Sequence, residues 1–250
     1  MIILYFSGTG NSKYVAEVFS KEMNIQCFSI EENIDFEVLI NANDTIAFCY
    51  PIYASRVPRI MRDFIAQHKI NLKDKKLIIF CTQALFSGDG ARALYALFPK
   101  SHIEVIYAEH FFMPNNINNL LILPLASSAK NKKLISKTEN KIISVCEEIK
   151  KGIVKKRGFN IISRALGMPQ ALFLPVMEKQ VNKSVIVRES CNNCQICVSV
   201  CPMNNLMFSD NQITHNSNCT ACYRCVNKCP QKAITVGYHG KVRKQYQEFI

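Results

Sequence analysis

Eight of the twelve cysteines in this 250-residue chain lie between Cys191 and Cys229. They form two copies of the pattern C-x2-C-x2-C-x3-C-P, the first beginning at Cys191 and the second at Cys219, with all cysteines and the final proline in register. Thiolate sulfur is a soft ligand that binds zinc or iron-sulfur clusters. The repeat therefore indicates metal ligation in a module of two related halves.

The spacing within each copy resembles that of bacterial ferredoxins, in which three cysteines hold one [4Fe-4S] cluster and the fourth ligates the other cluster. Structural zinc is the alternative, but its paired cysteines explain neither the third cysteine nor the proline, which can end a turn without an amide donor. Because both sets are complete, both clusters are expected to be electron carriers. The predicted ligands are Cys191, Cys194, Cys197 and Cys229 for one cluster, and Cys219, Cys222, Cys225 and Cys201 for the other.

A second region with chemistry is the polar loop in the stretch IILYFSGTGNSKYVAE. It stands between an apolar run typical of a strand and a helical pattern, where backbone amides and a helix N-terminus can bind phosphate. It lacks the Gly-Lys-Ser/Thr of a Walker A loop, and Lys13 stands where a dinucleotide fingerprint has its third glycine. An ordinary glycine turn is the remaining alternative. The loop residues resemble the phosphate loop of flavodoxins, which binds FMN: Ser7, Gly8, Thr9, Gly10, Asn11 and Ser12.

Doubly wound sheets bind ligands beyond the carboxyl ends of their strands, so the loops after the third and fourth predicted strands should flank the flavin ring. PIYASRVP follows Tyr50 and offers Tyr53 as a stacking aromatic, with core packing as the alternative. TQALFSGDGA follows Cys81, and a turn at a helix start is the alternative for its glycines. The candidate residues of these loops are Pro51, Ile52, Tyr53, Ala54, Thr82, Gln83, Ser87, Gly88 and Gly90.

Alternating strand-like and helical patterns over residues 1–157 predict an α/β flavodoxin-like, doubly wound, five-stranded parallel sheet. We expect strands at 2–6, 25–30, 45–50, 77–82 and 102–110, and an amphipathic covering helix within 127–156. Residues 158–187 lose this periodicity and contain prolines, which favours a connector packed against one or both domains. Residues 188–250 are predicted to form a small α+β, bacterial-type 2[4Fe-4S] ferredoxin domain with a C-terminal extension.

From end to end, the chain resembles the flavodoxin-ferredoxin fusion proteins of anaerobic bacteria, also described as ferredoxin-containing iron-sulfur flavoproteins. The resemblance rests on YFSGTGNS, on PIY followed by a proline, on SGDGA, on FFMPNN at 111–116 and on both cysteine motifs. It implies FMN and two [4Fe-4S] clusters. Because the loop offers a phosphate site but the sequence has no recognisable adenosine site, we expect noncovalent FMN, not FAD. Where many members carry tryptophan after PIY, this chain has Ser55, and it contains no tryptophan. Ring stacking would then fall to Tyr53 or another residue.

These features predict an electron-transfer protein that passes single electrons between the two clusters and FMN, with a redox protein such as a ferredoxin or a reductase as its partner. The alternative is an FMN-dependent reductase of a small-molecule acceptor that the clusters feed. No acid-base constellation identifies catalytic residues for such an enzyme, although His110 or Tyr53 could donate a proton if placed near the flavin.

The formal net charge of +12 raises the alternative of nucleic-acid binding. Two clusters and a flavin phosphate would roughly halve that charge, and no aromatic residues interrupt the basic ones in the lysine-rich segment at 127–156 to stack bases. We therefore expect no nucleic-acid partner. The chain runs from Met1 into a strand-like stretch without signal-peptide features, and no apolar run is long enough to span a membrane, so a cytoplasmic location is expected. Outside the motifs, Cys27, Cys49, Cys81 and Cys146 are predicted to be buried free thiols.

Overall fold

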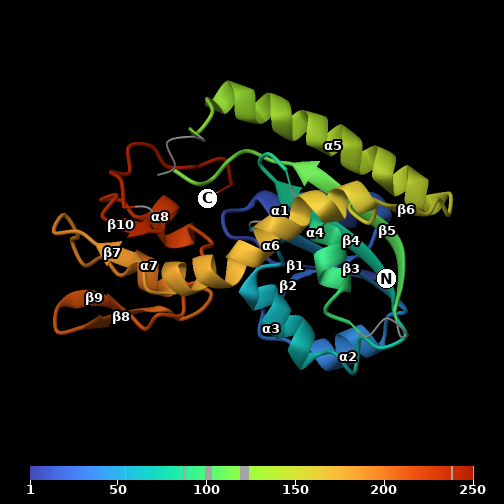
Figure 1. The fold of residues 1–250 in the computed structure, drawn as a ribbon, viewed down its shortest axis with the longest axis horizontal. Helices are drawn as coiled ribbons and strands as arrows, with labels where there is room; N and C mark the ends of the chain where they lie inside the picture. Colours follow the sequence, from blue (N-terminus) through green and yellow to red (C-terminus); the bar gives the residue numbers. More distant parts are fainter. Residues whose placement is uncertain (54, 87, 99–102, 119–123, 238, 250) are drawn as a thin grey trace.

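The computed structural model describes residues 1–250 except 54, 87, 99–102, 119–123, 238 and 250. Its larger part is a parallel six-stranded sheet in the order β2-β1-β3-β4-β5-β6 (Figure 1). The order 2-1-3-4-5 is that of flavodoxin-like doubly wound sheets, which confirms the predicted fold class. The strands are β1 (Ile2–Tyr5), β2 (Gln26–Ser29), β3 (Thr45–Pro51), β4 (Lys76–Gln83), β5 (Glu104–Phe112) and β6 (Lys155–Lys156).

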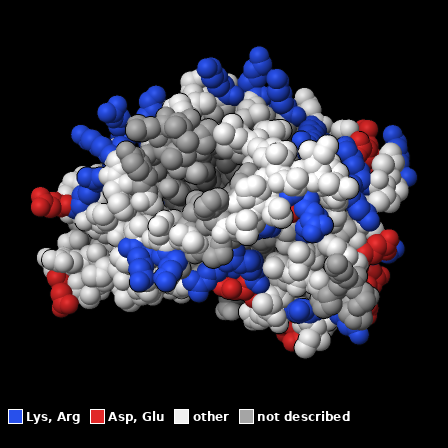
Figure 2. Space-filling model, in the orientation of Figure 1, with Lys and Arg blue, Asp and Glu red and all other residues white. Residues whose placement is uncertain are grey.

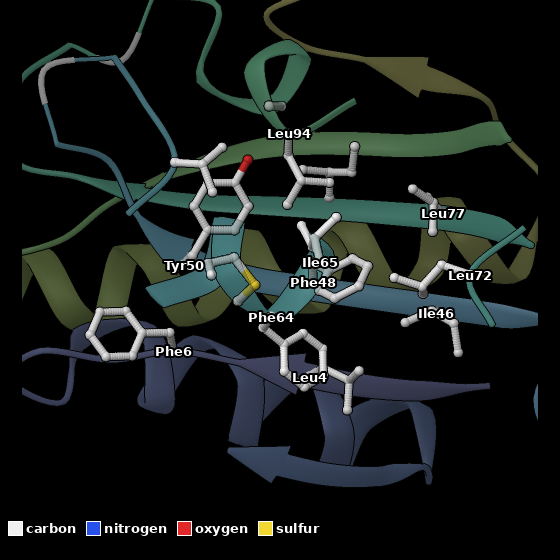
Figure 3. Close-up of a cluster of buried hydrophobic side chains, with 14 of the residues drawn as sticks. Leu4, Phe6, Ile46, Phe48, Tyr50, Phe64, Ile65, Leu72, Leu77 and Leu94 are labelled. Atoms are coloured by element: carbon white, nitrogen blue, oxygen red, sulfur yellow. The ribbon is translucent and has the colours of Figure 1, made fainter. Parts of the chain in front are cut away.

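Helices cover both faces of this sheet, which is why its central strands are almost continuously apolar. On one face, Phe48 and Leu77 pack against Phe64 of α3 and Leu94 of α4 (Figure 3). On the other face, α1 and α5 cover the sheet, and Phe80 meets Phe19 of α1 edge-on. The helices of this part are α1 (Asn11–Met23), α2 (Phe36–Asn41), α3 (Arg59–Gln67), α4 (Gly90–Tyr95) and α5 (Ser128–Lys150).

Strand β6 is the one element of the sheet that the sequence pattern did not predict. The apolar periodicity suggested that the covering helix continues to residue 156, but α5 ends at Lys150. Gly152 follows with a φ of 72°, a left-handed conformation that suits glycine and turns the chain back. Lys155 and Lys156 then pair with Tyr107 and Ala108 of β5.

A buried carboxylate on β5 fixes this edge of the sheet. Glu109 is 1% exposed, and its Oε1 lies 3.0 Å from Lys141 Nζ and 3.1 Å from Arg157 Nη1. Its Oε2 lies 3.2 Å from Lys155 Nζ. Lys141 and Lys155 belong to a lysine-rich stretch of the sequence, but both pair with this one buried anion. They hold α5 and β6 against β5.

The C-terminal part has the predicted α+β character. Two small antiparallel sheets pair β7 with β10 and β8 with β9, and two short helices, α7 and α8, lie beside them (Figure 1). Val185, Leu206, Val226 and Ile234 form its buried core. The elements are β7 (Val185–Val187), α7 (Ile196–Ser199), β8 (Leu206–Ser209), β9 (Gln212–His215), α8 (Arg224–Lys228) and β10 (Ile234–Val236).

Within the predicted connector, the structure has a helix, α6 (Ile161–Asn182), that the sequence pattern did not indicate because Pro169 and Pro175 lie inside it. Asn160 caps its start by accepting a hydrogen bond from the Ser163 amide at 2.7 Å. Further along, Glu178 pairs with Arg62 of α3 through two hydrogen bonds of 2.9 Å. Held to α3 by this ion pair, α6 crosses from the edge of the large sheet to the C-terminal part (Figure 1).

The four cysteines outside the motifs form no disulfide. Cys49, Cys81 and Cys146 are buried, as predicted, whereas Cys27 is only partly buried because β2 is the edge strand of the sheet. Within the described residues, no helix is both long and apolar enough to cross a membrane.

Replacing Glu109 with glutamine should lower the stability of the holoprotein by about 1 to 3 kcal/mol, because three cations lose their buried partner. Burial raises the pKa of the Glu109 carboxyl, but the His110 amide and Lys141 lower it more, so it lies below its ordinary value of 4.5. Its contribution is therefore present at neutral pH and is lost as the pH falls through the lowered pKa.

The urea midpoint, followed by circular dichroism at neutral pH and in acid, measures this effect. The matched control is Glu104→Gln at the exposed start of β5, which should change the midpoint little. Equal effects of the two substitutions would contradict the role given to Glu109.

Candidate functional site

A hollow of about 490 Å³ lies at the carboxyl ends of β1, β3, β4 and β5. Its place is the switch point of a doubly wound sheet, where such sheets bind ligands. Ten predicted site residues line it: Ser7, Gly8, Thr9, Asn11, Ser12, Pro51, Ile52, Tyr53, Thr82 and Gln83. The site prediction omitted six further lining residues, namely Ala84, Met113, Pro114, Asn115, Asn116 and Ile117.

Most of the omitted residues follow β5. The Met113 amide donates to the Gln83 carbonyl at 2.8 Å, which carries this segment along the end of β4 and into the hollow. The FFMPNN run at 111–116 was a signal that could have identified them, since it contributed to the family resemblance but not to the site prediction.

Two predicted glycines lie elsewhere. Gly88 packs against Gly167 of α6, where a Cβ on Gly88 would stand 2.9 Å from the Gly167 Cα. Gly90 begins α4, and its carbonyl accepts a hydrogen bond from the Tyr50 hydroxyl at 3.0 Å. Their role in binding stays a prediction. Ala54 and Ser87 fall outside the described residues.

The loop after β1 presents the N-terminus of α1 to the hollow. The first amides of a helix have no acceptor within the helix. Gly10 stands immediately before α1 and has no side chain that could accept hydrogen bonds from these amides. Gly10 has a φ of 96°, which favours glycine, and a Cβ there would collide with Phe249. The hydroxyl residues Ser7, Thr9, Ser12 and Thr82 line the same hollow, and the Ser12 and Thr82 hydroxyl oxygens lie 2.7 Å apart. Such an arrangement suits an anion.

Two buried polar atoms in the hollow could form hydrogen bonds with a ligand. Within the described part of the chain, neither the Tyr53 hydroxyl nor the Gln83 side-chain oxygen has a hydrogen-bond partner, although both are buried. Burial raises the pKa of the Tyr53 phenol well above its ordinary value, and the nearby Cys222 raises it further. Tyr53 therefore keeps its proton and can donate it in a hydrogen bond. Burying polar groups without partners is costly, which favours a ligand that supplies them.

The C-terminal extension covers the loop from outside. The Tyr246 hydroxyl donates to Asn11 Oδ1 at 2.6 Å, and the Phe249 ring stacks on Tyr14 with 4.9 Å between centroids. On the inner side, Asn11 Nδ2 donates to the Pro114 carbonyl at 2.9 Å. Asn11 thus ties three segments together, a positioning role that its place in the sequence motif did not indicate.

The eight motif cysteines surround two further hollows, with the predicted crossing between repeats. We call Cys191, Cys194, Cys197 and Cys229, which line one hollow, the outer cysteine set. We call Cys201, Cys219, Cys222 and Cys225, which line the other, the inner cysteine set. Within the described residues, no three His, Cys, Asp or Glu side chains close around a position for a single metal ion.

Backbone amides point at the cysteine sulfurs in matching places of the two repeats. The Asn193 and Ala221 amides lie 3.4 Å from the Cys191 and Cys219 sulfurs, respectively. The Asn205 and Ala233 amides lie 3.3 Å from the Cys201 and Cys229 sulfurs, respectively. Residues with positive φ recur in pairs that produce these turns: Asn193 and Ala221, Gln195 and Tyr223, Asn204 and Lys232. Amides directed at sulfur stabilise the thiolate form and tune iron-sulfur clusters.

Burial raises the pKa of the Cys222 thiol to about 12 and that of the Cys219 thiol to about 11. These thiols are therefore neutral at physiological pH unless a bound cation favours their ionised form. The iron ions of a cluster would supply that charge. The donor set thus fits a group that carries positive charge at every cysteine.

The hollow at the end of the large sheet and the inner cysteine set share a wall. A Cβ on Gly8 would collide with the carbonyl oxygen of Cys222 and would lie 3.2 Å from the Tyr53 hydroxyl. Gly8 is thus required by the close approach of the second motif, besides any need of the loop itself.

Arg224, between Cys222 and Cys225, clamps the two loops together. Its Nη2 donates to the Ser7 carbonyl at 2.7 Å and its Nε to the Gly8 carbonyl at 3.1 Å. The same guanidinium pairs with Glu31 through hydrogen bonds of 2.8 and 2.7 Å. A planar, bidentate donor of this kind suits a fixed junction.

Comparisons with known proteins agree with this two-part architecture. A family model described as a flavodoxin domain matches residues 2–117, and a model described as a 4Fe-4S dicluster domain matches residues 190–234. The chain therefore joins a flavodoxin domain, of the class that carries FMN, to a domain of the class that carries 4Fe-4S clusters, and both classes serve electron transport. A comparison with curated proteins found no match.

Two solved structures illustrate the likeness of the first part. Two-electron reduced Megasphaera elsdenii flavodoxin is 19% identical, with 56% of this chain and 99% of that chain covered and a TM-score of 0.40. Oxidised Flavodoxin 2 from Bacillus cereus is also 19% identical, with 59% of this chain and 97% of that chain covered and a TM-score of 0.40.

Replacing Arg224 with alanine should loosen the junction, because hydrogen bonds of a charged group contribute about 1.5 to 3 kcal/mol. Hydrogen-deuterium exchange of the loop amides at residues 7–12 should then quicken by about tenfold or more. Lys228→Ala, an exposed cation at the end of α8, is the matched control and should leave exchange unchanged. Unaltered exchange in the Arg224 variant would remove this residue from the clamp.

Proposed function

We propose that the chain is an electron-transfer iron-sulfur flavoprotein, a flavodoxin-ferredoxin fusion of the kind found in anaerobic bacteria. It passes single electrons between two [4Fe-4S] clusters and FMN and exchanges them with a redox protein. The observation that carries the proposal is the contact of Gly8 with Cys222, because electron transfer requires cofactors to be close. Residues 1–157 would hold FMN, residues 188–250 the clusters, and residues 158–187 would join them.

FMN would bind without a covalent bond in the hollow beside β1 to β5. The hydroxyls of Ser7, Thr9 and Ser12 and the first amides of α1 suit its phosphate, whose charge the helix N-terminus favours. Tyr53 and Gln83 would face the ring with the buried polar atoms that have no partner among the described residues. The sequence offers this phosphate cradle but no recognisable adenosine site, which favours FMN over FAD. When bound, FMN supplies a group that takes up electrons singly or in pairs.

The outer and inner cysteine sets would each hold one [4Fe-4S] cluster. Each set takes three cysteines from one repeat and the crossing cysteine, Cys229 or Cys201, from the other. The amides that point at sulfur, and the burial of the inner set, would tune each cluster. Eight thiolates would supply one ligand to each of the eight irons. No iron would keep an open position for a substrate, which suits a group that only carries electrons.

Replacing Cys229 with serine should remove the cluster of the outer set and spare that of the inner set. Anaerobically prepared wild-type protein should hold about eight irons and eight acid-labile sulfides, and the variant about half as many. Alkylation followed by mass analysis should then label Cys191, Cys194 and Cys197, while the inner set stays protected. Cys201→Ser is the matched variant, in which the pattern of labelling should be reversed.

Two results would overturn this ligation. One is stoichiometric zinc in place of iron. The other is labelling of Cys219, Cys222 and Cys225 in the Cys229 variant, which would mean that each repeat holds its own cluster.

Anaerobic reductive titration tests the function itself. The holoprotein should take up about four electrons per chain, one for each cluster and two for the flavin. Added oxidised ferredoxin should then withdraw them and restore both absorbance spectra. The titration uses donors of increasing strength. A flavin that stays oxidised while both clusters are reduced would exclude electron transfer between the clusters and FMN.

A further inference from the structure

We infer that electrons are exchanged at the outer cysteine set, and that the exchange partner is an acidic one-electron carrier protein that docks on a basic surface beside Cys229. This surface consists of Lys228, Lys232, Arg243 and Lys244, all of them exposed. The inference rests on the proposed function and adds to it the direction from which the partner approaches and the charge it carries.

The two cysteine sets differ in their access to solvent. In the outer set Cys194 is exposed, and Ile196 beside it is 38% exposed. In the inner set Cys222 and Cys225 are each only 8% exposed, and Cys222 lies against Gly8. A carrier protein that meets the surface can therefore approach the outer set closely, while the inner set faces the other hollow.

Hydrogen bonds place the four cations around Cys229, a member of the outer set. The Cys229 carbonyl accepts from the Lys232 amide at 3.1 Å and from Gln245 Nε2 at 2.7 Å. Lys232 Nζ in turn donates to the Arg243 carbonyl at 3.1 Å. Lys228 precedes Cys229 and Lys244 precedes Gln245, so the basic residues of α8 and of the C-terminal extension meet at one place.

Two exposed acidic residues, Glu189 and Asp210, stand on the other side of the outer set. Glu189 stands two residues before Cys191, and Asp210 precedes Asn211, whose carbonyl accepts from Asn193 at 2.9 Å. Both lie on the Cys191 side of the set, away from Cys229 in the sequence. Figure 2 shows basic side chains along the upper left margin of the molecule, where Figure 1 draws the loop of the C-terminal extension. An acidic surface is the complement of such a patch, and charge attraction raises the rate of encounter.

Stopped-flow mixing of anaerobic, oxidised holoprotein with a reduced acidic 2[4Fe-4S] ferredoxin tests the inference. The absorbance of the clusters should fall with a second-order rate constant that decreases as salt is added, because salt screens exposed charges. A fourfold variant has Lys228, Lys232, Arg243 and Lys244 all replaced by glutamine. At low salt, its rate constant should be about one tenth of the wild-type value or lower. The salt dependence should largely disappear in that variant.

The matched control removes four exposed lysines near the amino ends of the strands, by Lys21→Gln, Lys69→Gln, Lys73→Gln and Lys76→Gln. Its net charge equals that of the test variant, so a rate within about twofold of wild type would show that position decides. Iron content and the amplitude of bleaching by dithionite verify that clusters are intact. Should the fourfold variant lose iron, Lys228→Gln and Arg243→Gln alone should each slow the reaction about twofold to threefold.

Equal slowing of test and control variants, or a wild-type rate that ignores salt, would overturn the docking surface while cluster reduction itself still occurred. If the ferredoxin reduced neither clusters nor flavin in any variant, although dithionite did, the proposed exchange with a carrier protein would fail instead. The two failures are therefore distinguishable.

Discussion

The close approach of the loop after β1 and the second cysteine motif is the constraint on which the rest of the structure depends. One guanidinium, that of Arg224, donates to the carbonyls of Ser7 and Gly8 and pairs with Glu31. Arg224 stands between Cys222 and Cys225. The turn that positions these two cysteines is therefore also bonded to the loop after β1. Gly8 has no side chain, and any Cβ there would force the two loops apart.

Other elements make this junction rigid. Asn227 on α8 donates to the Asn116 carbonyl at 3.0 Å and accepts from the Tyr246 amide at 2.8 Å, so it joins the loop after β5 to the C-terminal extension. Helix α6 adds a second, distant attachment through Arg62 and Glu178. The two parts of the chain are thus fixed at several separate points, which limits relative motion more than a polar linker would.

Much of the fold and of the candidate site could be predicted from the sequence, because the patterns that indicate them lie within short segments. The cysteine spacing predicted both sets and their crossing, and alternating apolar runs predicted five strands of the sheet. What could not be predicted depends on contacts between residues far apart. Strand β6 carries Lys155, which pairs with the buried Glu109 on β5. Helix α6 continues through two prolines, and its Gly167 packs against Gly88 while its Glu178 pairs with Arg62. Gly88 and Gly90 illustrate the converse, since neither lines the hollow: Gly88 packs against Gly167 of α6, and Gly90 begins α4 and accepts a hydrogen bond from Tyr50.

We propose that the flavin and the clusters exchange electrons within one molecule. It is tested most directly by reducing the clusters with a fast pulse in anaerobic holoprotein and following the flavin absorbance over a tenfold range of protein concentration. The flavin absorbance should change in a first-order process whose rate constant is independent of protein concentration, because the junction at Gly8 and Cys222 is already formed. A rate that rises in proportion to concentration would mean transfer between molecules and would contradict it.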